Sequence, residues 1–354
     1  MSNKNFGIIE IYERKLETGE YKLMVKVSYL GAEGDFMHWE EISEEKRQEL
    51  QALYYRKPEF SAVKREFKKV SGGNTAITRY YFKELMSKVK MRRAKWTIEE
   101  VFQSKEVLGI FVGRIHNQRF FTEDTDNSEI TKIETAIRVG GAGIAYKPAN
   151  FPVKTVDNIL KRYNVNGNYY DYSCGWGARL LSSLRNGVNY FGTDPNYLLV
   201  DKLKEMYSDY KEAAGFFCPK ADIRAVGSEV LQEDWVGKIG VCFTSPPYFD
   251  LEDYKIGEQS IKKNSNYDSW LENYLRPTIE NCHKYLVDDG YFIINIKNSK
   301  SYSMVEDSRR IAEESGFIFS HYEILEVADR PNTLNNDERD LSEKIQVFTK
   351  SKQG

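Results

Sequence analysis

The chain has 354 residues, of which 41% are hydrophobic and 14% aromatic, and its formal net charge is -2. This length predicts a catalytic domain of about 200 residues plus an accessory one, and the composition excludes disorder over most of the chain. The sequence has no signal-peptide pattern and no apolar run of about 18 residues, which predicts a soluble cytoplasmic protein without a membrane span. The four cysteines and four histidines are widely spaced, which indicates neither a disulfide framework nor a metal site.

The N-terminal part predicts a mixed α and β accessory domain. Alternating stretches at 6–12 and 21–30, separated by a Thr-Gly turn, predict a hairpin. Ser43 and Thr97 are placed to cap two helices. The apolar residues 107–115 are compatible with a strand or a buried helix.

Positive charge is concentrated in this part of the chain. Between Arg56 and Lys95, thirteen basic residues stand against three acidic ones, a local charge of +10 that leaves -12 for the remainder. Aromatic residues are interleaved with them, and helices are expected over 59–91 with a break at 71–74. Such a segment is suited to binding a polyanion, and an ordinary solvated helical surface is the alternative.

A polar, acidic stretch at 121–128 and a glycine run at 140–143 indicate a domain boundary near residue 130. We therefore expect an accessory domain at 1–130, with possible DNA recognition, and a catalytic domain at 131–354. The catalytic part alternates predicted strands and helices, which indicates an α/β fold with a doubly wound parallel sheet. Strands are expected at 168–174, 189–194, 222–226, 239–244, 291–296, 318–326 and 344–350, and helices at 178–185, 197–214, 267–285 and 304–315.

A glycine turn, Gly175-Trp176-Gly177, follows the first of these strands, and Asp194 ends the second. Glycines let a ligand approach the backbone, a helix N-terminus offers free N–H groups, and an acid at the second strand end can accept from ribose hydroxyls. A dinucleotide would favour a third glycine where Leu180 stands. A nucleoside with a short charged tail fits better, since Asp171 can bind an ammonium. S-adenosylmethionine has that shape, and a purely structural turn is the alternative.

The most specific stretch is Ser245-Pro246-Pro247-Tyr248, which ends an apolar strand. Two prolines supply no N–H and hold the chain extended, so that nearby carbonyls stay free. The Ser245 hydroxyl and the Pro246 carbonyl can then accept hydrogen bonds from the amine of a planar ring that stacks on Tyr248. Core packing of the aromatic residues after the strand is the alternative.

The pairing of Asp171-Tyr-Ser-Cys-Gly-Trp-Gly177 with Thr244-Ser-Pro-Pro-Tyr248 resembles the S-adenosylmethionine-dependent DNA amino-methyltransferases over about residues 147–350. The resemblance implies a Rossmann-like methyltransferase sheet. It implies catalytic roles for Ser245, Pro246, Pro247 and Tyr248, and substrate contacts from Phe249 and Lys255. It implies cofactor contacts from Lys147, Phe151, Asp171, Cys174, Gly175, Gly177, Asp194, Ser228 and Thr244.

The activity implied by the resemblance is methyl transfer from S-adenosylmethionine to the exocyclic amine of a DNA base rotated out of the duplex. In this family a serine before Pro-Pro-Tyr is commoner in cytosine N4 enzymes, so cytosine is favoured over adenine N6. An RNA amine as substrate, or a non-catalytic DNA-binding protein with a vestigial fold, are the alternatives. A cognate restriction or defence-system partner is compatible with the resemblance, and no metal or membrane partner is expected.

Overall fold

The computed structural model divides into two compact units, Met1–Arg56 with Met86–Pro148, and Lys57–Leu85 with Ala149–Gly354. This division differs from a single boundary near residue 130, because the second unit takes in Lys57–Leu85 and the first unit continues to Pro148. The roles expected for two domains stay predictions. The structure describes residues 9–15, 19, 21–27, 42–69, 74–91, 94–116, 129–139, 145–163, 166–247, 249, 252–253, 264, 266–299, 301–323 and 343–350.

The first unit contains the expected hairpin and a helical core. Strand β1 (Ile9–Lys15) pairs antiparallel with β2 (Tyr21–Val27). Ser43 accepts from the Lys46 backbone at the start of one helix, and Thr97 forms a capping box at another, which confirms both predicted caps. The remaining elements are α1 (Glu44–Tyr55), β3 (Lys90–Met91), α5 (Ile98–Gln103), α6 (Lys105–His116) and α7 (Glu129–Val139).

The apolar residues 107–115 lie in helix α6 rather than in a strand. Leu108 and Phe111 are fully buried and pack in one cluster with Leu50 and Phe102. Their i, i+3 spacing places both side chains on the same side of the helix, so packing decides between the two interpretations that the apolar run allows.

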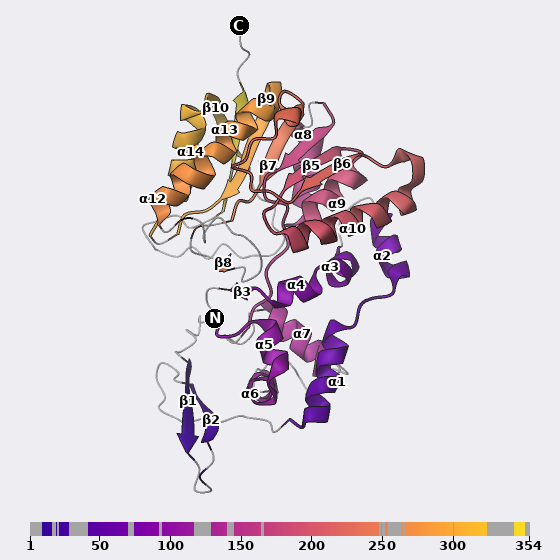
Figure 1. Cartoon of the computed structure of the whole chain (residues 1–354), viewed down its shortest axis with the longest axis vertical. Helices are drawn as coiled ribbons and strands as arrows, with labels where there is room; N and C mark the ends of the chain where they lie inside the picture. The colour runs from indigo at the N-terminus through magenta and orange to yellow at the C-terminus, as the bar shows by residue number, and fades with distance from the viewer. Residues whose placement is uncertain are drawn as a thin grey trace, which may run out of the picture. The chain divides into compact units, whose positions relative to one another are not determined.

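The second unit is built around a seven-stranded sheet (Figure 1). Its strands are β4 (Asn168–Asp171), β5 (Asn189–Thr193), β6 (Ala221–Arg224), β7 (Ile239–Thr244), β9 (Leu286–Ile296), β10 (Phe317–Glu323) and β11 (Lys344–Lys350). The other elements are α2 (Phe60–Phe67), α3 (Thr75–Tyr81), α4 (Lys83–Ser87, which crosses the unit boundary), α8 (Val153–Tyr163), α9 (Ala178–Arg185), α10 (Tyr197–Ala214), β8 (Glu252–Asp253), α12 (Tyr267–Trp270), a π-helical turn (Leu271–Leu275), α13 (Arg276–Tyr285) and α14 (Met304–Glu314).

The strand order is β10-β11-β9-β7-β4-β5-β6. Neighbouring strands from β9 to β6 run parallel, and β11 runs antiparallel to both β9 and β10. The chain proceeds outward from β4 in one direction through β5 and β6, and then resumes at β7 on the other side of β4. This is a doubly wound Rossmann-like sheet, as the sequence predicts, and its order reverses between β4 and β7.

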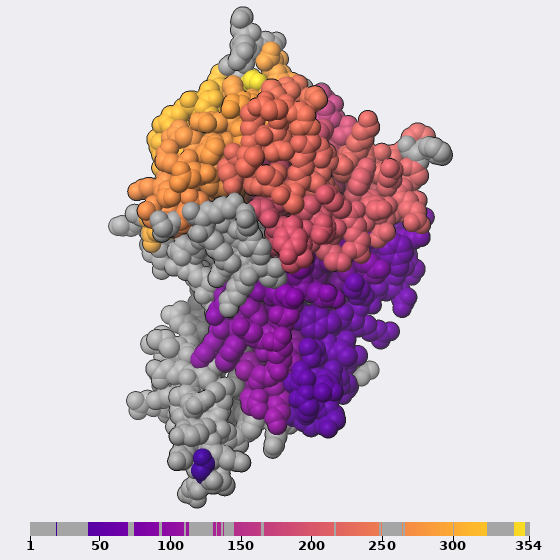
Figure 2. All heavy atoms as spheres, in the orientation of Figure 1, coloured from indigo at the N-terminus to yellow at the C-terminus, as the bar shows by residue number. Residues whose placement is uncertain are grey.

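The N-terminal segment of this unit packs on α10. The Phe67 ring lies 5.3 Å from that of Tyr210, and the Tyr81 hydroxyl donates to Asp209 at 2.6 Å. Figure 1 and Figure 2 show α2 beside α10, coloured indigo to violet and red. The helices predicted over 59–91 are present as α2, α3 and α4 up to Ser87, but Lys90–Met91 form strand β3 instead of continuing a helix. The break predicted at 71–74 lies, except for Asn74, outside the described residues.

In the ranges that the structure describes, no helix combines the length and the apolar character needed to cross a membrane.

Candidate active site

The carboxyl ends of β4 and β7 meet at the point where the strand order reverses. Tyr169 and Tyr170 pair with Val241 and Cys242, so that the two strand ends lie side by side. In doubly wound sheets, ligands bind in the crevice outside the strand ends at such a point. The two motifs singled out from the sequence are thus neighbours in space, although they are far apart along the chain.

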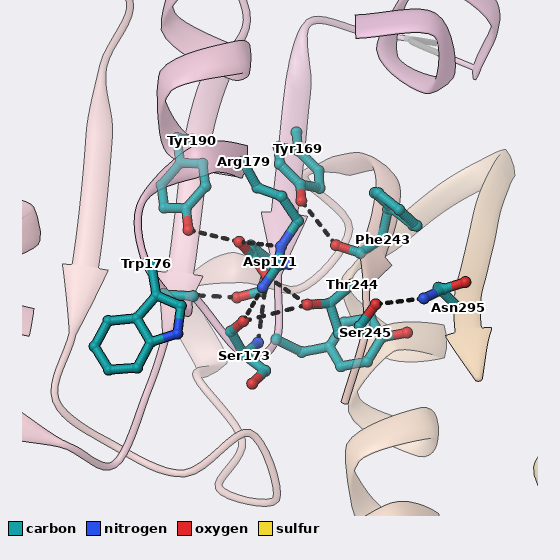
Figure 3. A network of polar contacts seen from close by, with 12 residues as sticks. Tyr169, Asp171, Ser173, Trp176, Arg179, Tyr190, Phe243, Thr244, Ser245 and Asn295 are labelled. Atoms are coloured by element: carbon teal, nitrogen blue, oxygen red, sulfur yellow. Dashed lines mark hydrogen bonds and ion pairs between the residues drawn. The ribbon is translucent and has the colours of Figure 1, made fainter. Parts of the chain in front are cut away.

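Asp171, at the end of β4, is the centre of a buried polar network (Figure 3). Its side chain is completely buried. Oδ1 accepts from Thr244 Oγ1 at 2.8 Å, and Oδ2 accepts from Arg179 Nε at 2.9 Å and from the Tyr190 hydroxyl at 2.8 Å. A buried carboxylate needs such donors to offset the loss of its hydration.

The ammonium contact expected of Asp171 stays a prediction, and the geometry argues against it. With the Ser173 backbone N–H, which donates to Oδ1 at 3.4 Å, each carboxylate oxygen accepts from two protein donors, so a ligand ammonium would have to displace one of them. The side chain has no exposed surface from which to do so. The observed role of Asp171 is to connect β4 with β7 and with helix α9.

Arg179, in the first turn of α9, is the counter-charge of Asp171. Its side chain is 7% exposed, and it also donates to the Ser173 carbonyl. Burial lowers the pKa of the guanidinium, but the charge and hydrogen bond of Asp171, together with Tyr169 and Tyr190, raise it, so the net pKa lies above the ordinary value. Arg179 therefore stays charged and ties the start of the glycine turn to the helix that follows it.

The glycine turn has the backbone conformation for which glycine is suited. Gly175 and Gly177 have φ of +56° and +75°, in the left-handed region. A Cβ on Gly177 would lie 2.9 Å from the Phe82 ring and 3.1 Å from Met206 Sδ. Close packing of the 57–85 segment is thus one reason for this glycine. Gly175 has no such ring against it and is the better placed of the two for backbone approach to a ligand.

Asp194 immediately follows β5, as predicted, and is 8% exposed. Its Oδ1 accepts from the Asn196 backbone at 3.0 Å. Burial raises the pKa of the carboxyl to about 6, although hydrogen bonds from the backbones of Asn196 and Gly175 lower it. A carboxylate at this place, beside the glycine turn, has the chemistry to accept from vicinal hydroxyls.

The Ser245-Pro246-Pro247 stretch leaves β7 directly after Thr244. Ser245 Oγ accepts from Asn295 Nδ2 at 2.7 Å (Figure 3). Asn295 lies on the neighbouring strand β9 and is 2% exposed. Pro246 is buried and Pro247 half-buried. The hydroxyl that the sequence marks as an acceptor is therefore held by a buried amide from the next strand.

Three predicted site residues have structural partners. The Phe249 ring is 8% exposed and packs 5.3 Å from Tyr302 and 5.6 Å from Tyr267, so its observed role is core packing. The Ser228 hydroxyl bonds Thr278 Oγ1 at 2.8 Å, toward α13. Cys174 Sγ donates to the Thr193 carbonyl at 3.3 Å, and burial raises the pKa of this thiol well above its ordinary value. Their ligand contacts stay predictions.

The remaining predicted residues are placed unevenly. Phe151 is half-buried, with its ring 5.5 Å from that of Phe243 and 5.7 Å from the Arg179 guanidinium carbon. Lys147 is half-buried and belongs to the first unit. Tyr248 and Lys255 lie outside the described residues. Within the described ranges, no cluster of three or more histidine, cysteine or acidic side chains has the arrangement of a metal site.

Sequence reasoning missed Arg179, Tyr190 and Asn295. Asn295 carries a usable signal, because it is a polar residue in the apolar run that forms the strand beside β7. Arg179 stands two residues after Gly177 in an apolar helix, where a buried cation requires a carboxylate. Tyr190 is one of many tyrosines, and its partner became evident only from the packing.

A comparison with known protein families gives a match that begins at strand β7. Residues 239–354 match the N6/N4 DNA methylase family. The match begins at the first residue of β7 and includes the Ser-Pro-Pro-Tyr stretch. Over this C-terminal third of the chain it confirms the resemblance to DNA amino-methyltransferases.

Several solved structures are similar to the chain. They include a TehB-like methyltransferase from Corynebacterium glutamicum (16% identity, 55% of this chain and 87% of that chain covered, TM-score 0.37). A Thermotoga maritima O-methyltransferase has 14% identity, 64% and 73% coverage and a TM-score of 0.40. Magnesium protoporphyrin IX methyltransferase from Synechocystis has 14% identity, 72% and 95% coverage and a TM-score of 0.38. A search of curated proteins returns no match.

Proposed function

We propose that this protein methylates the exocyclic amine of a flipped DNA base, with cytosine N4 favoured over adenine N6. The observation that carries the proposal is the hydrogen bond between Thr244 Oγ1 and Asp171 Oδ1. It joins the strand end that leads into Ser245-Pro246-Pro247 to the strand end that leads into the glycine turn. The residues proposed to bind the methyl donor and those proposed to bind the amine are therefore adjacent, at the point where the strand order of the sheet reverses.

The residues around the glycine turn fit S-adenosylmethionine. Gly175 allows close approach to the backbone, and the buried Asp194 carboxylate is able to accept from both ribose hydroxyls. When bound, the cofactor supplies a methyl group on a positively charged sulfur. Phe151 is proposed to lie near the methionine part, as the family resemblance implies, and the cofactor contact of Lys147 stays a prediction. Asp171 is assigned to holding the turn rather than to ligand contact.

The amine is activated by acceptors held in place. The lone pair of an aromatic amine is delocalised into the ring until its N–H groups donate to fixed acceptors. We assign these acceptor roles to Ser245 Oγ and the Pro246 carbonyl. Asn295 occupies one lone pair of the Ser245 hydroxyl and leaves the other for the substrate amine. Acceptors fixed by proline and by a buried amide need no reorganisation during transfer.

The target base is proposed to be extrahelical, because its amine is out of reach in a stacked duplex. Tyr248 would then stack on the ring. The preference for cytosine rests on the serine before Pro-Pro-Tyr, since a hydroxyl stands there instead of a carboxylate or carboxamide.

A methyl-transfer assay tests the proposal. Duplex DNA is incubated with S-adenosylmethionine labelled in the methyl group, and the product is digested to nucleosides. We expect label in N4-methylcytosine, at a rate lowered about a hundredfold or more in Ser245→Ala. Ser208→Ala, at an exposed position on α10, is the matched control and should behave as wild type.

The outcomes separate the parts of the proposal. Label in N6-methyladenine would mean that the target base is adenine rather than cytosine, and the proposed methyl-transfer reaction would still hold. Faster methyl transfer to single-stranded RNA than to DNA would mean that the substrate is RNA rather than DNA. The absence of transfer to any nucleic acid, together with no S-adenosylmethionine binding by calorimetry, would support a vestigial fold.

A further inference from the structure

About half of the basic segment between Arg56 and Lys95 belongs to the same unit as strand β7. Residues 57–69 carry five basic side chains and two acidic ones. We define the basic face by the five: Lys57, Lys64, Arg65, Lys68 and Lys69. Of the two acidic residues, Glu66 is buried and accepts from the Ile77 backbone at 3.0 Å, whereas Glu59 is exposed.

The pattern of burial orients the basic face outward. Val63, Glu66 and Phe67 are buried, and the Phe67 ring contacts Tyr210 of α10. Arg65, Lys68 and Lys69 are exposed, and the Lys64 side chain is 44% exposed. Because a helix turns once every 3.6 residues, one side of α2 meets α10 and the other presents the cations to solvent. In the space-filling view, α2 reaches the surface alongside α10 (Figure 2).

Aromatic rings lie among these cations. The rings of half-buried Phe60 and Tyr80 are 5.5 Å apart. The Lys64 ammonium lies 5.1 Å from the Phe60 ring centre, and that of Lys57 lies 5.2 Å from the Tyr80 ring centre. These contacts hold the aliphatic stems against apolar surface and leave the charged ends outside.

The ion pair found for the basic face among the described residues is exposed. Lys64 Nζ is 3.9 Å from Glu212, whose side chain is 76% exposed. Exposed pairs of this kind are weak and are screened by salt, so a phosphate can displace them. The net positive charge of the face is therefore available to a polyanion.

The basic face is fixed relative to the cofactor end of the sheet through α10. That helix begins three residues after Asp194, and its contact with α2 is at Tyr210, fourteen residues beyond the Asn196 cap. At 1.5 Å per residue this separation is about 20 Å along the helix. Duplex DNA rises 3.4 Å per base pair, so the same length corresponds to about six base pairs.

We propose that the basic face binds the phosphates of duplex DNA flanking the methylated base, independently of sequence. The inference rests on the proposed function and deepens it by naming a contact surface on the catalytic unit. Contacts of lysine and arginine to phosphates act through charge and carry no sequence information. The face therefore supplies affinity and holds the duplex in place, and specificity must come from other residues.

Salt-dependent binding tests this proposal. Lys64, Arg65, Lys68 and Lys69 are replaced together by Gln, and binding to two unrelated duplexes is measured by fluorescence anisotropy between 50 and 200 mM salt. Loss of four phosphate contacts should reduce the slope of log affinity against log salt by about 3 to 4, equally for both duplexes. The control removes the same charge at four exposed lysines of the same unit, Lys161, Lys204, Lys220 and Lys284, and should leave the slope unchanged.

Each outcome of the binding experiment either supports or overturns the assignment of the basic face to DNA. An unchanged slope in a quadruple variant that binds S-adenosylmethionine as wild type does would overturn the proposal, as would a loss confined to one duplex. If the quadruple variant does not fold, Arg65→Gln with Lys68→Gln should reduce the slope by about 2. Tighter binding of double-stranded RNA by the same face would overturn its assignment to DNA. Methyl transfer to DNA by the wild-type protein is measured in parallel to test the proposed function separately. If only the basic face is wrongly assigned, this activity will still be observed.

Discussion

Thr244 Oγ1 donates to Asp171 Oδ1 at 2.8 Å, and this bond joins the two strands whose ends form the candidate active site. Both side chains are completely buried. The bond fixes the position of the strand end before Ser245 relative to the strand end before the glycine turn. Methyl transfer depends on such alignment, because misplacement of reacting groups by about 1 Å can cost two orders of magnitude in rate.

Replacement of Thr244 by Val should affect both stability and activity. Valine keeps the shape and removes the donor to Asp171, which we expect to lower the free energy of unfolding by about 1–3 kcal/mol. Thr244→Ser keeps the hydroxyl and should retain more of both properties. Urea unfolding and kcat for methyl transfer provide the measurements. Thr278→Val on α13, which removes the bond to Ser228, should cost similar stability with a smaller loss of kcat. Equal losses of kcat would mean that the Thr244 bond has no special place in catalysis.

Removal of the Arg179 side chain should be strongly destabilising. Arg179→Met leaves the Asp171 carboxylate buried without its counter-charge, for which we expect a loss of about 3–5 kcal/mol in unfolding free energy. The Asp171→Asn, Arg179→Met double variant should recover part of this loss, because it buries no net charge. Chemical denaturation of Arg179→Met, Asp171→Asn and the double variant measures the coupling. Strictly additive losses would contradict the description of these two residues as one buried pair.

Asn295 should act through Ser245. If the amide serves to orient the hydroxyl, Asn295→Ala and Ser245→Ala will each lower kcat, and the double variant will be no slower than Ser245→Ala alone. Single-turnover rates at saturating DNA are the readout, and thermal unfolding of each variant serves as the check on folding. Multiplicative losses in the double variant would assign Asn295 a role that is independent of Ser245.

Cofactor affinity should rise with pH around the pKa of Asp194. Burial raises this pKa from 3.8 to about 6, so the stability associated with the protonated acid is present below about pH 4 and is lost as pH rises through 6. Ligand hydroxyls that donate to the carboxylate favour the ionised form. S-adenosylhomocysteine should therefore bind about tenfold more weakly at pH 5 than at pH 7 by calorimetry. Asp194→Asn should bind more weakly and show no such dependence, and an unchanged wild-type profile between these pH values would contradict the ribose contact.

Gly177 should tolerate alanine poorly because of Phe82. The added Cβ would lie 2.9 Å from that ring and would need a positive φ, so Gly177→Ala should cost about 1–3 kcal/mol in unfolding free energy. The cost should shrink in a Phe82→Leu background, which removes the clash but keeps the backbone strain. Gly187→Ala, also at positive φ but with no atom near the added Cβ, is the matched control and should show the strain alone. Equal losses at both glycines would exclude a steric contribution from Phe82.

The sequence by itself determined the alternation of strands and helices along the catalytic part, the caps at Ser43 and Thr97, and both chemical motifs. These features are local, because proline, glycine and capping side chains act on their own few residues and apolar periodicity marks each element. The strands 239–244 and 344–350 were predicted with their observed bounds for this reason.

Only the tertiary structure decided which side chains meet. From the sequence alone, the Asp171 carboxylate is available to bind a ligand. The fold places Arg179, Tyr190 and Thr244 around it and buries it completely. The sequence does not show that Phe249 packs among other rings, and its substrate contact stays a prediction. The basic segment is contiguous in sequence, yet the chain's contacts assign Lys57–Leu85 to the unit that contains the seven-stranded sheet. Burial and charge pairing depend on residues distant in the chain, and no local pattern specifies them.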